Sequence, residues 1–477
     1  MSATVLFVNK TTKTYPSSTI PNLDTDTVRA IIFHDSMPIT SLVEHYTTIP
    51  FGTTNNSVVQ YPFDFRVDNS MERVWKSNSN GFDSNDMSLS EYLGGEKSVT
   101  VPCLDLSRER YALDINVNDL WSPVVEGNCF IGGKYTVQLE QQIETFLDTH
   151  QKCIAVANGT DALEISYRAV SEQSTVPKDK QVVLVPSFTF IATAAAVKLA
   201  GIQIEFLDIS DEPGNYVTTA EQIQSALHPN VVAIVGVSLF GQVPDWVEWN
   251  KVVDIFNKIS NTSIVIIEDA AQSFGSGKSM RGLTDISCTS FYPSKLLGGY
   301  GDGGAILANE RWYSIIRSIA NHGIETEQYT HTRLGRNSRL DGLQAAILSY
   351  KLSRFADIKA SRHRVVTVYN KELESCRCIV TPTQKDNNQI LSQFTVQVVR
   401  GSRDNLLHYL QKHNVDARVF YHTPCHQQIA FADPNAYLPN TVNKSMTVLS
   451  FPAFPFMTWY EIKFISHLIQ TWEKTIL

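Results

Sequence analysis

Lys295 lies in Cys288–Ala305, the stretch of this chain whose residues are best suited to catalysis. The stretch reads CTSFYPSKLLGGYGDGGA. Lys295 stands between a strand-like run, Cys288–Phe291, and five glycines at positions 298, 299, 301, 303 and 304. Glycines let the backbone approach a ligand closely. A lysine held there can lose its proton through burial and attack a carbonyl carbon, forming a Schiff base. The usual partner in that chemistry is pyridoxal phosphate, which serves as an electron sink.

A lysine in a glycine-rich turn is most often a surface residue, so the hypothesis depends on the segments that accompany it. Asn158-Gly159-Thr160-Asp161 stands at a strand-to-helix turn, where free backbone N–H groups and the helix dipole suit a phosphate. Many such turns bind nothing. Asp269 ends a strand, where a carboxylate can hold a pyridine nitrogen protonated. Its alternative role is to cap the next helix.

Two further side chains fit the same cofactor. Phe190, in Pro186–Phe190, follows a strand and can stack on a flat ring, although ordinary core packing is the alternative. Ser290 precedes Lys295 closely, and its hydroxyl can join a phosphate cup. A serine satisfied within its own strand is equally compatible with that position.

The elements around these residues alternate between apolar strands and helices. Strands that are apolar throughout and separated by helices indicate a mainly parallel sheet covered on both faces. In such sheets ligands bind beyond the carboxyl ends of strands. Asn158, Ser187, Phe240 and Asp269 all fall at or just past such ends. The predicted strands are Ile154–Ala157, Val182–Pro186, Ile202–Ile209, Val231–Leu239 and Ser263–Glu268.

The chain divides into three predicted parts. Residues 1–98 form an N-terminal extension or small domain of unknown role, with strand-like runs at Thr4–Val8, Val28–Phe33 and Val58–Phe65 and a linker at Lys76–Asp86. Residues 99–350 form the large α/β domain. Residues 351–477 form a smaller α+β unit. A long helix is predicted to start at Asn337. In the smaller unit we expect strands at Phe394–Val399 and Ala417–Tyr421 and a helix at Tyr460–Thr475.

Composition excludes several classes of function. With 43% hydrophobic and 18% charged residues, the 477-residue chain has a globular composition. A net charge of -8 without a basic run argues against nucleic acid as a partner. No apolar stretch reaches membrane-spanning length, and no secretory signal opens the chain. Seven scattered cysteines predict neither a disulfide framework nor a metal site. We expect a cytoplasmic protein.

Six motifs occur in a specific order: NGTDAL, PSFTFIAT, VSLFGQ, IEDAAQSFG, TSFYPSK-x-LG-x-YGDGGA and NSRLDGLQAAIL. Each is weak alone, but in this order they resemble the nucleotide-sugar aminotransferases of the DegT/DnrJ type, from about Val101 to the C-terminus. These are fold-type I pyridoxal-phosphate enzymes. The resemblance therefore implies their mainly parallel α/β fold with a smaller C-terminal α+β domain, pyridoxal 5′-phosphate as the cofactor, and glutamate and a nucleotide-linked keto-sugar as substrates.

The resemblance also implies roles for individual residues. Lys295 is the lysine that binds the cofactor covalently and moves the proton. Asp269 contacts the pyridine nitrogen, Gln272 lies on the side of the ring hydroxyl, and Phe190 stacks on the ring. The expected phosphate ligands are Gly159, Thr160 and Ser290.

In this family two subunits share each active site, so the resemblance implies a homodimer. Asn337 is expected to reach the phosphate of the neighbouring subunit's cofactor, and Arg339 its sugar substrate. The segment around Tyr421 is expected to line the substrate side. There Phe420 and His422 depart from the His-Tyr-Pro run that the family favours, which leaves the exact sugar open.

Within the family, the chain most resembles the enzymes that aminate C3 of a UDP-linked 2-acetamido-3-keto-hexuronic acid. The alternative is an aminotransferase for a dTDP-3-keto- or 4-keto-6-deoxyhexose. Two further readings are a dehydratase that uses pyridoxamine phosphate and a non-catalytic regulator. Such dehydratases carry histidine in place of the lysine, so Lys295 argues against the first. Lys295, Asp269 and Asn337 together argue against the second.

Overall fold

A computed structural model describes residues 2–7, 12–16, 28–34, 73–75, 99–325, 329–384 and 388–476. Its centre is a seven-stranded sheet in the order β5-β11-β10-β9-β8-β6-β7. β11 runs antiparallel to both of its neighbours, and the other pairs are parallel. This confirms the predicted mainly parallel sheet. The strands are β5 (Lys152–Val156), β6 (Val182–Pro186), β7 (Gln203–Leu207), β8 (Val231–Val237), β9 (Val265–Asp269), β10 (Ile286–Ser290) and β11 (Gly304–Ala308).

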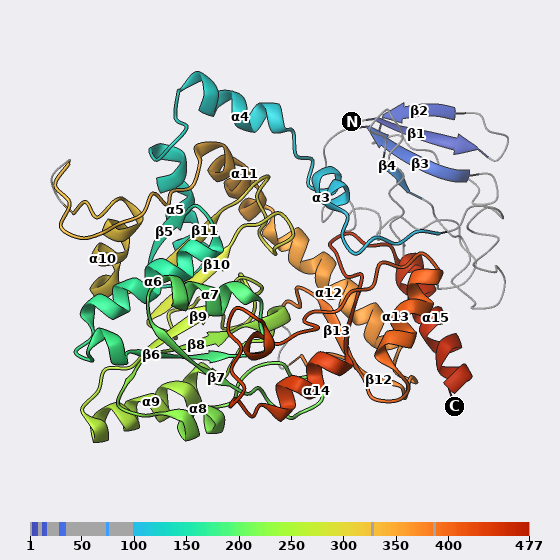
Figure 1. Cartoon of the computed structure of the whole chain (residues 1–477). Helices are drawn as coiled ribbons and strands as arrows, with labels where there is room; N and C mark the ends of the chain where they lie inside the picture. The colour runs from blue at the N-terminus through green and yellow to red at the C-terminus, as the bar shows by residue number, and fades with distance from the viewer. Residues whose placement is uncertain are drawn as a thin grey trace.

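Helices cover both faces of this sheet (Figure 1). Val183 and Val185 of β6 join one hydrophobic core, whereas Leu184 between them joins another. Side chains alternate across a strand, so a strand that is apolar at every position needs a helical layer on each side. The first core contains residues of α6 (Gly159–Gln173), α7 (Ile191–Leu199) and α10 (Glu310–Ala320), and the second contains residues of α8 (Ala220–Ala226) and α9 (Trp246–Ser260).

A third core lies on the β5–β11 side of the sheet, where Ala155 and Leu307 pack against helices from two distant parts of the chain. The predicted long helix from Asn337 is wrong at its start. The helix begins only at Gly342, because Asp341 before it has an extended backbone and forms an isolated bridge to Ile131. The helices on this side are α4 (Val117–Glu126), α5 (Lys134–Leu147) and α11 (Gly342–Ser353).

The C-terminal part of the chain forms a three-stranded sheet in the order β12-β13-β14 with helices packed on it. The predicted strand at Ala417–Tyr421 is wrong. β14 takes the place beside β13, so only Arg418 makes an isolated bridge, to Ser450. The elements are α12 (Phe355–Glu372), β12 (Ile379–Val380), β13 (Phe394–Val398), α13 (Arg403–Lys412), α14 (Pro439–Thr447), β14 (Val448–Phe451) and α15 (Trp459–Ile476).

Val101 belongs to the core of this C-terminal unit, through a parallel bridge to Val415. It precedes α3 (Leu106–Ala112), so the chain passes the small unit before it enters the large one. The division of the chain at residues 98 and 350 stays a prediction.

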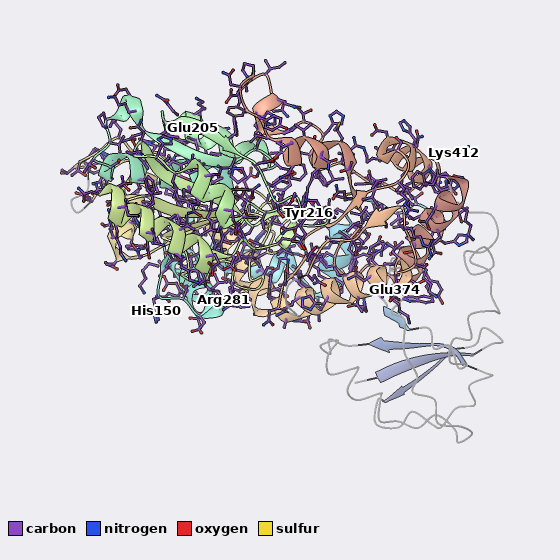
Figure 2. The ribbon with its side chains drawn as sticks, turned by 90° about the horizontal axis from the view of Figure 1, so that it is seen from below. His150, Glu205, Tyr216, Arg281, Glu374 and Lys412 are labelled. Carbon is purple, nitrogen blue, oxygen red and sulfur yellow. The ribbon has the colours of Figure 1, made fainter. Side chains whose placement is uncertain are left out.

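The large and small units meet around Tyr216. Seen from below, Tyr216 lies between the part that carries Glu205 and the part that carries Glu374 and Lys412 (Figure 2). Its hydroxyl donates to Thr395 O of β13 at 3.1 Å. A hydrogen bond from a fully buried ring therefore joins the two units.

The N-terminal strands form a sheet of their own, in the order β2-β1-β3-β4. β1 and β3 confirm the first two predicted strands. The predicted strand at Val58–Phe65 and the predicted linker at Lys76–Asp86 lie outside the described residues. The strands are β1 (Ser2–Phe7), β2 (Thr12–Pro16), β3 (Val28–His34) and β4 (Arg73–Trp75).

In the described part of the chain, no helix combines the length and apolar character needed to cross a bilayer. The same residues contain no group of three or more His, Cys, Asp or Glu side chains arranged to hold a metal ion.

Candidate active site

The residues predicted from strand ends gather at one edge of the seven-stranded sheet. Asn158 follows β5, Ser187 follows β6, Phe240 follows β8, and Asp269 ends β9. Parallel strands bring their carboxyl ends to the same edge, where α/β sheets bind ligands. β10 also ends there and leads directly into the loop that carries Lys295.

Lys295 and Asp269 are close enough to influence each other's charge. Burial lowers the pKa of Lys295 below its usual value, and the negative charge of Asp269 opposes that shift. The same attraction lowers the pKa of Asp269, against a larger rise caused by burial. A lysine with a lowered pKa holds more of its amine in the neutral, nucleophilic form.

The Asp269 carboxylate is held by two donors. Thr193 Oγ1 donates at 2.8 Å and Ala271 N at 3.1 Å. Thr193 was not predicted as a site residue, although it stands in the PSFTFIAT motif one helical turn after Phe190. A buried carboxylate is stabilised by a nearby cationic donor, and a protonated pyridine nitrogen is such a group. This donor set therefore fits pyridoxal phosphate.

Gln272, Tyr421 and Phe190 form a connected group beside Asp269. Gln272 Oε1 accepts from Phe240 N at 2.9 Å, and its Nε2 donates to Tyr421 OH at 3.0 Å. The rings of Tyr421 and Phe190 lie 6.1 Å apart between centroids. Phe190 is 53% exposed, which contradicts ordinary core packing.

The predicted phosphate ligands also lie together. Gly159 begins α6, and Asn158 Oδ1 caps that helix by accepting from Asp161 N at 2.8 Å. A Cβ on Gly159 would lie 2.7 Å from Ser290 Cβ, so only glycine allows this approach. Thr160 follows in the first turn. Ser290 Oγ accepts from Tyr292 N at 3.2 Å, which leaves its own hydrogen free to donate. The helix N-terminus and this hydroxyl suit a phosphate.

Asn337 and Arg339 lie in an extended stretch before α11 and are exposed on either side of the buried Ser338. Ser338 Oγ accepts from Ala157 N at 3.1 Å, which places the stretch next to the start of α6. Among the residues that the structure describes, neither side chain forms a hydrogen bond or ion pair. Arg339 therefore makes no ion pair with the nearby Asp341 in this part of the chain.

One contact at this edge of the sheet was not predicted from the sequence. Ser187 Oγ lies 2.6 Å from His426 Nδ1 and accepts from His426 N at 3.0 Å. Ser187 O also accepts from Cys425 N at 2.9 Å. These bonds fix the segment after Tyr421 to the end of β6. Ser187 was noted for its place at a strand end, but nothing near His426 indicated its partner.

Comparison with known proteins supports the same chemistry. Residues 114–470 match the DegT/DnrJ/EryC1/StrS aminotransferase family. The UDP-2-acetamido-2-deoxy-3-oxo-D-glucuronate aminotransferase of Pseudomonas aeruginosa is 37% identical over 76% of this chain and 97% of its own length. The UDP-N-acetyl-3-dehydro-alpha-D-glucosamine 3-aminotransferase of Acidithiobacillus ferrooxidans is 31% identical over 78% and 98%.

Among solved structures, DesV of S. venezuelae is similar with a TM-score of 0.72 and 26% identity, covering 79% of this chain and 99% of that one. The family match begins at residue 114, so β1–β4 and α3 lie ahead of it. The candidate site, in contrast, lies wholly inside the matched range.

Proposed function

We propose specific residue roles and a specific sugar for this chain. The chain belongs to the DegT/DnrJ/EryC1/StrS aminotransferase family and is a pyridoxal-phosphate-dependent nucleotide-sugar aminotransferase. It takes an amino group from a donor and gives it to a keto-sugar. In our proposal the donor is glutamate, and the acceptor is C3 of a UDP-linked 2-acetamido-3-keto-hexuronic acid. The proposal rests on one observation: Lys295, with its lowered pKa, interacts with the buried Asp269 at the carboxyl ends of the strands.

Pyridoxal phosphate, when bound, supplies the electron sink that makes the proton on the substrate carbon removable. Lys295 takes that proton on its Nζ and returns it, because burial keeps part of the amine neutral. Asp269 holds the pyridine nitrogen protonated, and Thr193 and Ala271 keep its carboxylate oriented. Gln272, which Phe240 and Tyr421 orient, would contact the cofactor on the side of its ring hydroxyl.

In the same proposal, the backbone N–H groups of Gly159 and Thr160 and the Ser290 hydroxyl bind the phosphate. Phe190 presents its exposed ring face to the cofactor ring. These contacts hold the reacting carbon near Lys295, which converts a bimolecular encounter into an oriented reaction.

The choice of a uronic acid is supported by the relative from Pseudomonas aeruginosa, whose name describes a 3-oxo-glucuronate. Arg339 is exposed and has no partner in the described residues, so its guanidinium is available to bind a carboxylate through two parallel hydrogen bonds. Tyr421 is a second substrate contact in this proposal, since its hydroxyl accepts from Gln272 and can donate onward.

The test is to incubate the enzyme with glutamate and a panel of nucleotide-linked keto-sugars and to identify the amino-sugar by mass and NMR. We expect the 3-keto-uronate to have the higher kcat/KM when compared with its 6-deoxy counterpart. If the 6-deoxy sugar is the better substrate, the uronate assignment is wrong and the chain is a deoxysugar aminotransferase.

We also propose a homodimer in which Asn337 and Arg339 serve the neighbouring subunit's site. Their exposure and lack of partners in the described part of the chain support this role. Mixing an inactive Lys295→Ala protein with an inactive Arg339→Ala protein then restores one native site in each hybrid dimer, about a quarter of all sites. If the subunits exchange and no activity returns, each site is built from a single chain.

A cytoplasmic location completes the proposal. It is supported by seven free cysteines, four of which are buried, since such thiols persist in a reducing compartment. Fractionation of the producing cells followed by detection of the protein tests this point.

A further inference from the structure

Helix α11 contacts the backbone of the glycine-rich loop after Lys295 at two places. Gln344 Oε1 accepts from Tyr300 N at 2.7 Å, and Lys351 Nζ donates to Gly298 O at 2.5 Å. The two side chains are about two helical turns apart, so they lie on the same face of α11. One rigid helix therefore fixes both ends of the Gly298–Tyr300 backbone.

The glycines of this loop make that close fit possible. A Cβ on Gly299 would lie 2.9 Å from Gln344 Oε1, and a Cβ on Gly301 would lie 2.9 Å from Gln344 Nε2. On the other side, a Cβ on Gly298 would lie 2.3 Å from Pro293 O. The loop backbone is thus packed between α11 and the segment that contains Lys295. A shift of the Gly298 backbone therefore changes the position of Lys295.

Lys351 is a buried cation with a dedicated counter-ion. Its side chain is almost wholly buried, and its Nζ pairs with Glu109 of α3, which is also buried. The charge of Glu109 also affects the loop. The pKa of Tyr300 is raised to about 12, mainly by burial and secondly by the charge of Glu109. A buried ammonium is costly unless an acid and further acceptors satisfy it. Glu109 and Gly298 O together meet that requirement.

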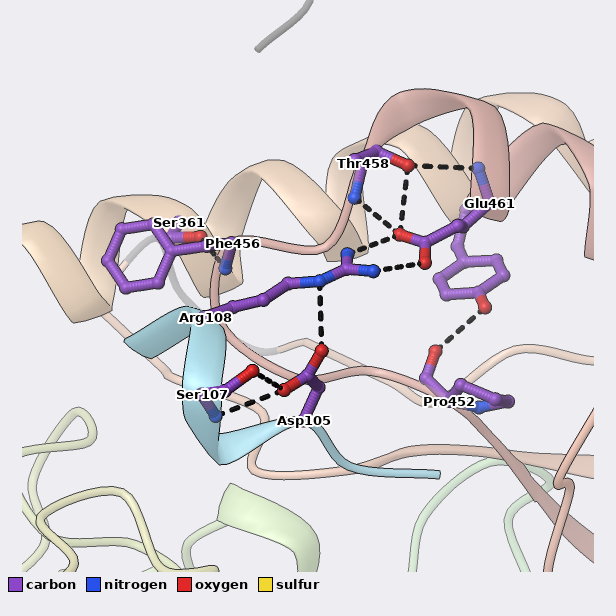
Figure 3. Close-up of polar contacts among 9 residues, drawn as sticks. Asp105, Ser107, Arg108, Ser361, Pro452, Phe456, Thr458 and Glu461 are labelled. Atoms are coloured by element: carbon purple, nitrogen blue, oxygen red, sulfur yellow. Dashed lines mark hydrogen bonds and ion pairs between the residues drawn. The ribbon is translucent and has the colours of Figure 1, made fainter. Parts of the chain in front are cut away.

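The neighbouring residue on α3 binds the other unit of the molecule. Arg108 donates to both carboxylate oxygens of Glu461 of α15, at 2.6 Å each, and pairs with Asp105 at 3.1 Å (Figure 3). Its guanidinium also lies over the Phe454 ring, 5.2 Å from the centroid. Consecutive residues of α3 therefore contact the C-terminal unit and, through Lys351, the lysine loop.

We propose that Glu109 and Lys351 form a positioning pair for Lys295, and that α3 ties this pair to the C-terminal unit. The pair holds the carbonyl of Gly298, three residues after Lys295, and so limits where the lysine amine can lie. α3 lies ahead of residues 114–470, so the family match does not cover it. The inference rests on the role proposed above for Lys295.

The experiment uses the full chain loaded with pyridoxal phosphate and the double variant Glu109→Gln/Lys351→Met, which removes both charges and leaves no unpaired ion. The matched control is Lys444→Met. Lys444 is also almost wholly buried and bonds backbone carbonyls, those of Glu212 and Asn215, but it lies on α14, away from the lysine loop. The readouts are the pH titration of the visible absorbance, kcat, both KM values and Tm.

We expect the double variant to shift the midpoint of the absorbance titration by about half a pH unit or more, because the surroundings of Lys295 change. Its kcat falls by about tenfold while both KM values stay within about twofold. In Lys444→Met, Tm falls and the midpoint and kcat stay near those of the unmodified enzyme. If the double variant does not fold, Glu109→Asp, which keeps the charge but shortens the side chain, is expected to give a smaller shift in the same direction.

A double variant with an unchanged midpoint and kcat overturns the proposal. The proposal is also overturned if Lys444→Met loses as much kcat and shifts the absorbance midpoint as far as the double variant does, because the cause is then general destabilisation. Failure of the proposed function is recognised separately: the unmodified enzyme would show no visible absorbance with pyridoxal phosphate, or Lys295→Ala would keep its activity.

Discussion

The residues proposed to hold the cofactor and those proposed to meet the sugar lie in differently built regions. Asp269 is buried at the end of β9, with donors on both of its oxygens. Lys295 is followed by a loop that α11 holds at two points. Arg339, by contrast, is exposed and has no partner in the described part of the chain.

This difference follows from what each region has to do. Proton transfer at one carbon needs groups fixed to within a fraction of an ångström, and strand ends backed by packed helices provide that rigidity. A large nucleotide-sugar needs an open approach, so the groups that receive it remain exposed. The comparison predicts that substitutions in the buried region impair both half-reactions, whereas those in the exposed region impair only the sugar half-reaction.

The largest effect is expected for Lys295→Ala. The variant loses both the covalent link to the cofactor and the group that moves the proton, so turnover falls by more than about a thousandfold. Steady-state rates with glutamate and the keto-sugar measure the loss. The thermal melt is expected to drop only by what the lost cofactor link contributes. A variant that keeps normal turnover removes Lys295 from the mechanism.

Asp269→Asn is expected to come next. Asparagine keeps the shape but lacks the charge that holds the pyridine nitrogen protonated, so both half-reactions slow by about a hundredfold or more. In the protein without cofactor the pKa of Lys295 falls further, because the charge of Asp269 raises it. The pH dependence of the rate of pyridoxal phosphate binding measures that shift.

Thr193→Val is the matched control for Asp269→Asn, since it removes one donor and leaves the charge. Its expected loss is about tenfold in both half-reactions, the scale of one hydrogen bond to a charged group. If Asp269→Asn slows the sugar half-reaction alone, the buried region is not the shared chemical centre.

Sequence patterns predicted the buried region well because its causes are local. The apolar run Val182–Pro186 is a strand with those bounds, since only a strand covered on both faces uses such a run. Asp269 was recognised because it ends a second such run. A residue type and its place along a strand were sufficient in both cases.

Contacts between distant segments were beyond the same reasoning. Ala417–Tyr421 has the composition of a strand, but β14 occupies the position beside β13, which only the tertiary structure decides. His426 and Glu109 reach their partners, Ser187 and Lys351, across about half the length of the chain. No spacing rule connects such pairs, because the fold alone brings them together.

A smaller and more selective effect is expected for Arg339→Lys. The substitution keeps the positive charge but loses the two parallel donors of the guanidinium. If the sugar is a uronic acid, kcat/KM for the sugar falls by the equivalent of about 1–3 kcal/mol, while the glutamate half-reaction stays nearly unchanged. Single-turnover rates for each half-reaction separate the two effects. An equal loss in both half-reactions would mean that Arg339 acts with the buried region, and the proposed difference between the two regions would be wrong.

Tyr421→Phe is expected to have the smallest effect, and it tests the boundary between the two regions. The hydroxyl accepts from Gln272 Nε2 at 3.0 Å, while the ring lies beside Phe190, so phenylalanine keeps the ring and loses one hydrogen bond. The expected cost is about 0.5–1.5 kcal/mol in kcat/KM for the sugar. Burial raises the pKa of Tyr421 above its usual value, so the hydroxyl stays protonated and the loss is the same from neutral to mildly alkaline pH.

The matched control is Tyr437→Phe, because that side chain is 86% exposed and its hydroxyl is expected to contribute nothing to turnover. If Tyr421→Phe slows the glutamate half-reaction as much as Asp269→Asn does, then Gln272 and Tyr421 act on the cofactor rather than on the sugar. The boundary between the rigid and the open region then lies beyond Tyr421, and the rigid part of the site includes the segment that Ser187 and His426 hold in place.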